Sequence, residues 1–116
     1  MMRSVILTLL FAAMGFAADV TGTWNFTVET DMGTGTPTIV LKQDGDKLSG
    51  TYSGQLGEAK VTGSVKGEAV EIWFEAAPQG DTIKVKYTGK IESASKMSGD
   101  VDLGGMAKGK FMGIKK

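Results

Sequence analysis

The chain of 116 residues contains no cysteine and no histidine, and its only arginine is Arg3. Without cysteine the chain can form neither a disulfide nor a thiolate metal site, so its stability must come from packing. Histidine and cysteine are the side chains that most often act as general base or nucleophile in enzymes. We therefore expect no enzymatic activity and no cofactor.

Positive charge is also scarce. From Ala18 onward, 12 lysines stand against 13 acidic residues, a formal charge of −1, and no basic patch is visible in the sequence. Proteins that bind nucleic acid usually carry clustered lysine and arginine, so we expect no nucleic-acid partner. Asp44 and Asp46 flank a glycine, but two acids in a turn lack the further oxygen ligands of a calcium site. We therefore expect no metal site.

One long hydrophobic run is present, from Val5 to Phe16, shortly after Arg3. A membrane-spanning helix needs about 20 apolar residues, so this run is too short to serve as an anchor. Gly15 and Ala17 suit the small-residue positions of a signal peptidase site. We expect residues 1–17 to be a signal peptide and residues 18–116 to be a single exported domain, periplasmic or extracellular, with no membrane span after cleavage.

Glycine, in contrast, is abundant and patterned. Six glycines each lie between two apolar residues at two-residue spacing, the period of a β-strand, so each glycine shares the apolar face of its strand. A glycine inside a strand costs roughly 0.5–1 kcal/mol relative to alanine. Such glycines indicate strands that coil sharply or an interior that leaves room for a ligand. They are Gly22, Gly50, Gly63, Gly89, Gly99 and Gly109.

Alternating apolar and polar residues, interrupted by turn residues about every 10–12 positions, predict an all-β domain of short antiparallel strands. Eight consecutive strands with one apolar face can hide both edges by closing into an up-and-down barrel, which we favour over the alternative of a β-sandwich. The expected ranges are Gly22–Thr30, Thr38–Gln43, Lys47–Gly54, Ala59–Lys66, Ala69–Ala76, Thr82–Ile91, Lys96–Leu103 and Ala107–Ile114.

The charged residues on the polar face support the pairing of the last two expected strands in particular. A three-residue loop at 104–106 would set Gly99 opposite Phe111 on the inner face and Asp100 opposite Lys110 on the outer face. Opposite charges then meet across the strands. Phe111 would cover the strand glycine opposite it.

Trp73 is unusual, because it is a large aromatic residue on a face that is otherwise polar. The register expected around the loop at Pro78 places Trp73 opposite Lys84 and Glu71 opposite Lys86. Stacking of Trp73 on Lys84 would be a structural role. A protein or sugar contact, or a subunit interface, is the functional alternative.

The two ends of the expected barrel differ. The connections at one end are short and charged, whereas those at the other end are mostly longer, rich in glycine, and carry apolar residues. Apolar loop tips at a barrel mouth indicate an entrance or a contact surface. The alternative is that these residues fold inward and fill the core. The loop residues are Met32, Leu56, Pro78, Leu103 and Met106.

Few polar side chains fall on the expected inner face: Gln43, Tyr52 and Tyr87. Such groups are usually bonded to backbone or water when buried, and the alternative is a hydrogen bond to a ligand. Tyr52 is the better candidate because it lies near the apolar mouth. The candidate ligand-binding residues are Met32, Tyr52, Leu56, Phe74, Pro78, Leu103 and Met106.

The segment Gly22-Thr23-Trp24 at the start of the first strand resembles the Gly-X-Trp motif of the calycins, which include lipocalins, fatty-acid-binding proteins and avidins. Residues 48–52, LSGTY, are similar to an avidin strand. The resemblance implies an eight-stranded barrel with Trp24 packed across its closed end and small hydrophobic ligands entering at the other. No arginine is present to stack on Trp24, and two tryptophans cannot form the aromatic cage of avidins, so biotin is not implied.

We therefore expect a non-enzymatic exported barrel that binds a small hydrophobic or amphipathic molecule at the end with apolar loops. The alternative is a secreted or envelope protein-interaction module, for example one like an inhibitor, with a filled core and a protein partner.

Overall fold

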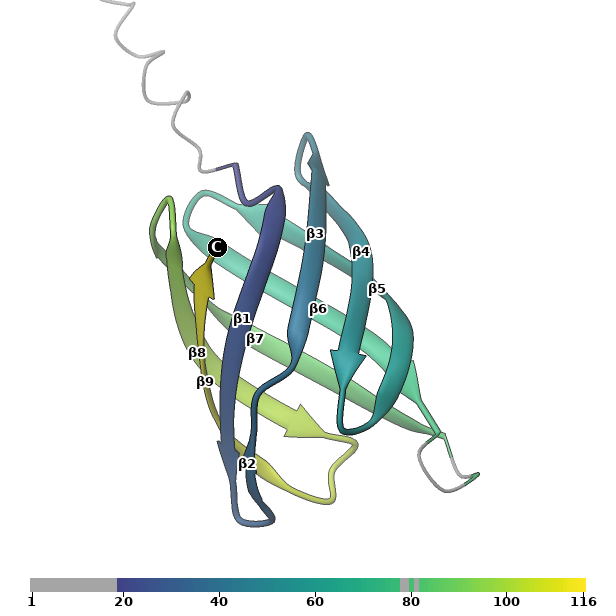
Figure 1. Cartoon of the computed structure of the whole chain (residues 1–116). Coiled ribbons are helices and arrows are strands. Elements are labelled where there is room, and N and C mark those ends of the chain that lie inside the picture. Colours follow the sequence, from purple (N-terminus) through teal and green to yellow (C-terminus); the bar gives the residue numbers. More distant parts are fainter. Residues whose placement is uncertain (1–18, 78–79, 81) are drawn as a thin grey trace, which may run out of the picture.

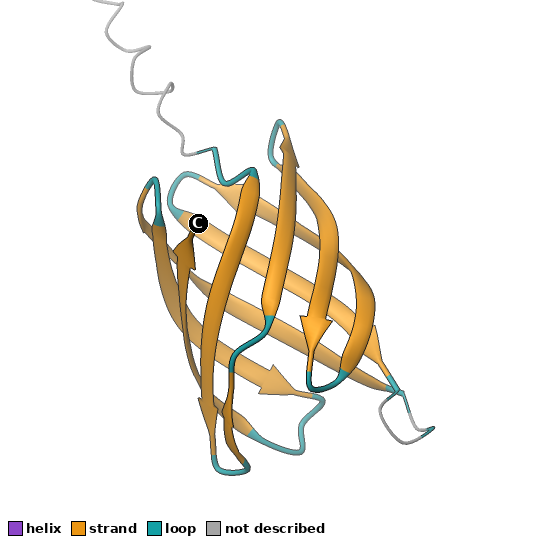
Figure 2. Ribbon diagram, in the orientation of Figure 1, coloured by secondary structure: helices purple, strands orange, loops and turns teal. Residues whose placement is uncertain are grey.

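The structure is a computed structural model that describes residues 19–77, 80 and 82–116. These residues form strands and connecting turns and no helix (Figure 2). The same residues therefore include no helix long and apolar enough to cross a membrane. The expected signal peptide, residues 1–17, lies outside the described residues.

The strands form one antiparallel sheet in the order β2-β1-β3-β4-β5-β6-β7-β8-β9, and β1 also pairs with β9. This last pairing closes eight of the strands into a barrel (Figure 1), so the predicted barrel is confirmed and the sandwich is wrong. The strands are β1 (Gly22–Thr30), β2 (Gly33–Gly35), β3 (Thr38–Asp44), β4 (Lys47–Gly54), β5 (Gly57–Lys66), β6 (Ala69–Ala76), β7 (Ile83–Ser93), β8 (Lys96–Leu103) and β9 (Lys108–Lys115).

Strand β2 is the element that the apolar pattern did not predict, because its sequence, Gly-Thr-Gly, contains no large apolar side chain. It pairs with the end of β1, with Val28 opposite Gly35 and Thr30 opposite Gly33. Strand β3 pairs only with the beginning of β1, over Gly22–Asn25. The β1–β2 hairpin therefore extends the barrel wall beyond β3 at one end of the molecule (Figure 1).

The expected register between the last two strands is confirmed. Gly99 lies opposite Phe111, and Asp100 lies opposite Lys110, with which it forms an ion pair. The Phe111 ring reaches past Gly99, so that a Cβ atom added at Gly89 would lie 2.9 Å from its tip. The aromatic ring thus covers two strand glycines.

The expected register between β6 and β7 is wrong by two residues. Trp73 lies opposite Lys86 rather than Lys84, because β6 ends at Ala76 and pairs there with Ile83, which leaves a longer connection than we expected. A shift of two residues keeps every side chain on its face, so the apolar pattern cannot detect it. The Glu71 carboxylate still reaches the Lys86 ammonium diagonally, at 3.2 Å.

Neighbouring backbones approach closely at the inner-face glycines. A Cβ atom added at Gly63 would overlap the carbonyl oxygen of Glu71, and one added at Gly109 would overlap that of Glu29. Gly89 and Gly99 lie opposite each other, and a Cβ atom added at Gly99 would overlap the Cα atom of Gly89. These positions exclude any side chain because the strands coil tightly around a narrow barrel.

The barrel is closed by packing at the end that holds the short charged turns. Trp24 is fully buried there, and its indole Nε1 donates a hydrogen bond to the carbonyl oxygen of Val20 at 2.9 Å. The Gln43 side chain accepts a hydrogen bond from the Val20 amide and donates one to the carbonyl oxygen of Gly45, both at 2.9 Å. Gln43 therefore serves to seal this end, and its polar atoms are satisfied by backbone.

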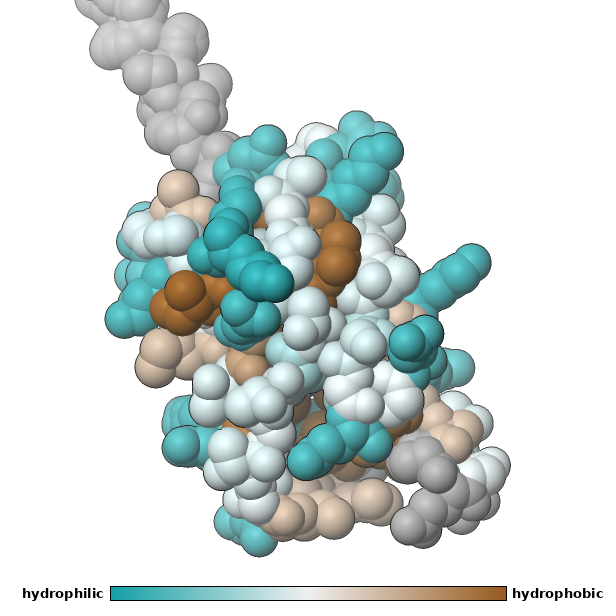
Figure 3. Space-filling view, in the orientation of Figure 1, coloured by the Kyte–Doolittle hydropathy of each residue, from teal (hydrophilic) through white to brown (hydrophobic). Residues whose placement is uncertain are grey.

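The outer wall is mixed in character. Figure 3 shows hydrophobic areas, in brown, between hydrophilic and neutral residues on the face that carries β1 and β3. The exposed large hydrophobic residues of the wall are Val40 on β3 and Met112 and Ile114 on β9.

The close strand approach leads to a stability prediction. We expect Gly63→Ala to lower the free energy of unfolding by about 1–3 kcal/mol, because the new methyl group meets the rigid backbone of β6. Gly35→Ala is the matched control, since the nearest atom there is the flexible Gln55 side chain at 3.4 Å. Urea denaturation measures both, and equal stability of Gly63→Ala and the parent chain would contradict this view of the glycines.

Candidate functional site

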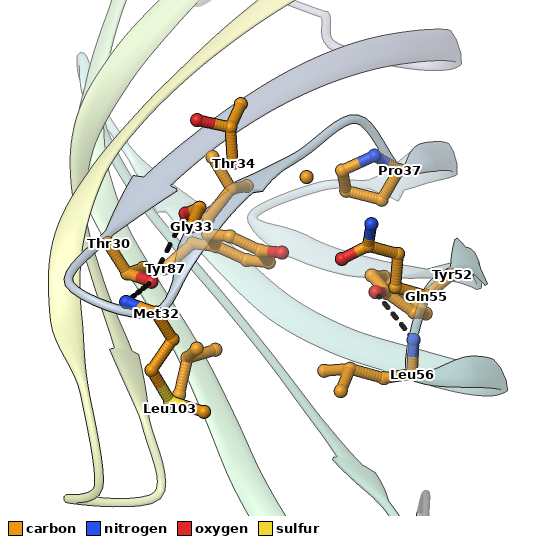
Figure 4. Close-up of a pocket in the computed structure, with 12 residues that line it drawn as sticks. Thr30, Met32, Gly33, Thr34, Pro37, Tyr52, Gln55, Leu56, Tyr87 and Leu103 are labelled. Carbon is orange, nitrogen blue, oxygen red and sulfur yellow. Dashed lines mark hydrogen bonds between the residues drawn. The ribbon is translucent and has the colours of Figure 1, made fainter.

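A cavity of about 280 Å³ lies at the end of the barrel that carries the β1–β2 hairpin, whereas Trp24 lies near the start of β1 at the other end. Its wall comes from the β1–β2 hairpin on one side and from the β4–β5 turn on the other, as Figure 4 shows. The end of β8 and the middle of β7 complete it. The lining residues are Val28, Thr30, Met32, Gly33, Thr34, Gly35, Pro37, Tyr52, Gln55, Leu56, Tyr87 and Leu103.

The β1–β2 hairpin is held in place by local hydrogen bonds. The Thr30 hydroxyl accepts a hydrogen bond from the Met32 amide at 3.0 Å and donates one to the carbonyl oxygen of Gly33 at 3.3 Å. This arrangement keeps the Met32 side chain near Leu103 at one side of the cavity (Figure 4). The Met32 residue is 69% exposed, so it forms part of the rim.

Aromatic rings form the inner part of the site. The Tyr52 ring stacks on Phe74 with 4.2 Å between the ring centroids, and Phe74 lies 6.3 Å from Tyr87. Tyr87 in turn meets Phe26 and Phe111 edge-on, at 5.2 Å and 5.1 Å. Edge-to-face and offset contacts of this kind stabilise a fixed arrangement of rings. The cavity therefore ends on a rigid aromatic layer.

The two tyrosine hydroxyl groups differ in their partners. The Tyr52 hydroxyl accepts a hydrogen bond from the Leu56 amide at 3.5 Å, which connects β4 to the β4–β5 turn. Tyr87 is only 2% exposed, and its hydroxyl has no hydrogen-bond partner within the part of the chain that the structure describes. Figure 4 shows the Tyr87 ring pointing into the cavity, toward Gln55 and Tyr52.

The electrostatic character of the site is neutral, because none of the described lining residues is charged. Burial raises the pKa of Tyr87 well above its usual range, and the neighbouring Tyr52 raises it further. Burial also raises the pKa of Tyr52, against the opposing hydrogen bond from Leu56. Both hydroxyl groups are therefore protonated at neutral pH.

Four of the seven predicted ligand-binding residues meet at the cavity: Met32, Tyr52, Leu56 and Leu103. Three do not belong to its described wall. Phe74 packs against the Tyr52 ring without reaching the cavity, because it is buried behind that ring. Met106 is 63% exposed and lies outside the wall, and Pro78 lies outside the described residues.

Trp73 is not part of the cavity. It lies on the outer face of β6, half-buried, between Thr62 of β5 and Lys86 of β7. The expected contact with Lys84 is replaced by this position opposite Lys86. A role for Trp73 in an interface stays a prediction.

Several cavity residues were absent from the predicted set. Tyr87 was predicted on the inner face, but its distance from the mouth could not be judged before the register of β6 and β7 was known. Gln55 precedes Leu56 in the β4–β5 turn, and its polarity hid its position at the rim. Thr34 and Gly35 belong to β2, which the apolar pattern did not indicate.

The comparisons with known proteins concern the fold. The chain matches no protein family model and no curated protein sequence. It is similar to the solved structure of a redesigned β-barrel, mFAP0, bound to DFHBI, with a TM-score of 0.64 and 17% identity over 84% of this chain and 98% of that chain. A redesigned β-barrel, mFAP1, bound to DFHBI, is similar with a TM-score of 0.62 and 15% identity over 84% and 94%. EF1p2_mFAP2b bound to DFHBI has a TM-score of 0.58 and 16% identity over 84% and 93%.

The buried state of Tyr87 leads to a pH prediction. An unfolded tyrosine loses its proton near pH 10, whereas the raised pKa of Tyr87 keeps it protonated in the folded chain. The stability associated with this group is therefore complete below about pH 10 and falls as the pH rises further, by up to roughly 1.4 kcal/mol per pH unit.

Urea unfolding between about pH 9 and 11 tests this dependence. Tyr87→Phe removes the ionisable hydroxyl, so we expect its free energy of unfolding to fall less steeply with pH than that of the parent chain. Lysine deprotonation is common to both proteins and cancels in the comparison. Equal slopes would show that Tyr87 ionises equally well in the folded chain.

Proposed function

We propose that this protein is a non-enzymatic, calycin-like exported barrel that binds a small hydrophobic or amphipathic molecule in the cavity at the β1–β2 end. The observation that carries the proposal is the cavity itself, about 280 Å³ in volume, with a neutral wall and an aromatic inner layer. Ligand pockets typically measure about 300–1,000 Å³ and combine an apolar wall with a few polar groups. The cavity volume lies just below that range, which favours a small ligand over a long lipid.

The aromatic and aliphatic side chains of the wall supply the main attraction. Met32, Leu56 and Leu103 contribute apolar surface at the rim, and Tyr52 contributes a ring deeper inside. Removing apolar ligand surface from water stabilises a complex by about 25 cal/mol per Å². The designed barrels with a similar fold were solved bound to DFHBI, which supports the idea that a barrel of this size holds a small molecule.

Export is part of the proposal and rests on the sequence of residues 1–17. The hydrophobic run ends at small residues that suit signal peptidase, and the domain that follows has no cysteine to be oxidised outside the cytoplasm. The absence of histidine and cysteine supports a role without catalysis.

One observation favours a second function. Met32 and Met106 are both strongly exposed at the same end of the barrel, 69% and 63%. Exposed apolar residues at loop tips also suit contact with a protein partner. A protein-interaction module is therefore the alternative to ligand binding.

Native mass spectrometry of the protein purified from its own host distinguishes the two functions. We expect a mature chain that begins at Ala18 and a stoichiometric bound molecule of low mass. A protein partner in place of the small molecule would favour the interaction module. A mass that includes residues 1–17 would contradict export.

The two exposed methionines also supply a matched test of the binding site. We expect Met32→Asp to weaken binding of N-phenyl-1-naphthylamine, a neutral apolar fluorescent probe, by roughly 10-fold, because a carboxylate at the cavity wall must lose water when the ligand enters. Met106→Asp places the same charge outside the wall and should leave the affinity unchanged. Fluorescence titration measures both, and equal effects would place the probe elsewhere.

A further inference from the structure

The hydroxyl of Tyr87 is the one polar group of the described inner face for which the fold provides no partner. Gln43 is bonded to backbone on both sides, and the Tyr52 hydroxyl accepts the Leu56 amide. The Tyr87 residue is 2% exposed, and its hydroxyl forms no hydrogen bond with residues 19–77, 80 and 82–116. A buried hydroxyl without a partner is destabilising, so its orientation toward the cavity needs another explanation.

The packing around Tyr87 holds this hydroxyl in one direction. The ring meets Phe26 at an interplanar angle of 81° and Phe111 at 66°. Such edge contacts on a tightly packed strand restrict rotation of the ring. A donor that is already fixed in place binds with little loss of conformational entropy. The Tyr87 hydroxyl is therefore held in a position to donate a hydrogen bond to a ligand atom in the cavity.

The chemistry of the site indicates what that ligand atom is. A phenol donates a hydrogen bond more readily than it accepts one, because its oxygen lone pair is shared with the ring. Burial raises the pKa of Tyr87, so the hydroxyl retains its proton. An ionised ligand would lose its hydration without gaining an opposite charge, because the described wall is uncharged. These points favour an uncharged acceptor such as a carbonyl oxygen.

The rim offers a second polar group of the right kind. The Gln55 side chain lines the cavity and faces Tyr87 in Figure 4. Its amide can donate as well as accept. A polar group of a ligand that enters between β2 and the β4–β5 turn can therefore lose its bound water and form a hydrogen bond with Gln55 before it reaches Tyr87.

We infer that the cavity selects a small, uncharged, flat molecule with a carbonyl group, and that the Tyr87 hydroxyl donates a hydrogen bond to the carbonyl oxygen. The flat shape follows from the two aromatic rings that line the cavity, those of Tyr52 and Tyr87. This inference rests on the proposed binding function and specifies its ligand class.

Three probes of nearly equal shape test the inference: 2-acetylnaphthalene, which has a ketone, 2-ethylnaphthalene, which lacks it, and 2-naphthoate, which is charged. We expect the parent chain to bind the ketone about 3- to 10-fold more tightly than the ethyl compound in calorimetric or fluorescence titrations. The carboxylate should bind most weakly.

Two variants test whether the preference comes from the Tyr87 hydroxyl. Tyr87→Phe should remove the preference for the ketone while the affinity for 2-ethylnaphthalene is retained or improved. Met112→Ala is the control, because Met112 lies exposed on the outer wall and outside the cavity, and it should keep the preference. Near-ultraviolet circular dichroism verifies that both variants fold, and the comparison of probes on the parent chain needs no variant.

The outcomes separate this inference from the function on which it rests. If neither the naphthalene probes nor N-phenyl-1-naphthylamine binds, the proposed binding function is wrong. If N-phenyl-1-naphthylamine binds but the ketone binds no better than the ethyl compound, the function stands and the inferred ligand class is wrong. A ketone preference that persists in Tyr87→Phe would contradict the assignment to Tyr87.

Discussion

The close approach of neighbouring backbones at the inner-face glycines is the constraint on which the structure depends. At Gly63 and Gly109 the space that a Cβ atom would occupy already holds a carbonyl oxygen of the next strand. Strands that meet this closely coil strongly enough for β1 to reach β9 and close the barrel. Closure removes the sheet edges that a chain of this size would otherwise expose.

Side chains fill the interior of this narrow barrel more completely at one end than at the other. At one end Trp24, Gln43 and the short turns close the space with side chains and backbone hydrogen bonds. At the other end β3 no longer pairs with β1, and β2, which consists of glycine and threonine, pairs with β1 instead. Because β2 has almost no side-chain bulk, the space above the aromatic layer stays open as a cavity.

Much of this arrangement could be read from the sequence, because the apolar alternation marks which face of each strand is inside. That pattern predicted the closed barrel and the pairing of Gly99 with Phe111. It could not predict the two-residue shift between β6 and β7, since such a shift keeps all side chains on their faces. It also missed β2, which forms through backbone hydrogen bonds without apolar side chains. For the site, the pattern identified apolar residues such as Leu56. It missed Gln55 because that side chain is polar, and the depth of Tyr87 depends on the register between β6 and β7.

We propose that the open end of this tightly coiled barrel holds a neutral ligand above Tyr87. A crystal structure of the protein with 2-acetylnaphthalene tests it most directly. We expect the naphthalene within the cavity and the ketone oxygen within hydrogen-bond distance of the Tyr87 hydroxyl. A cavity filled by its own side chains, with the probe absent or bound on the outer wall near Val40 or Met112, would contradict it.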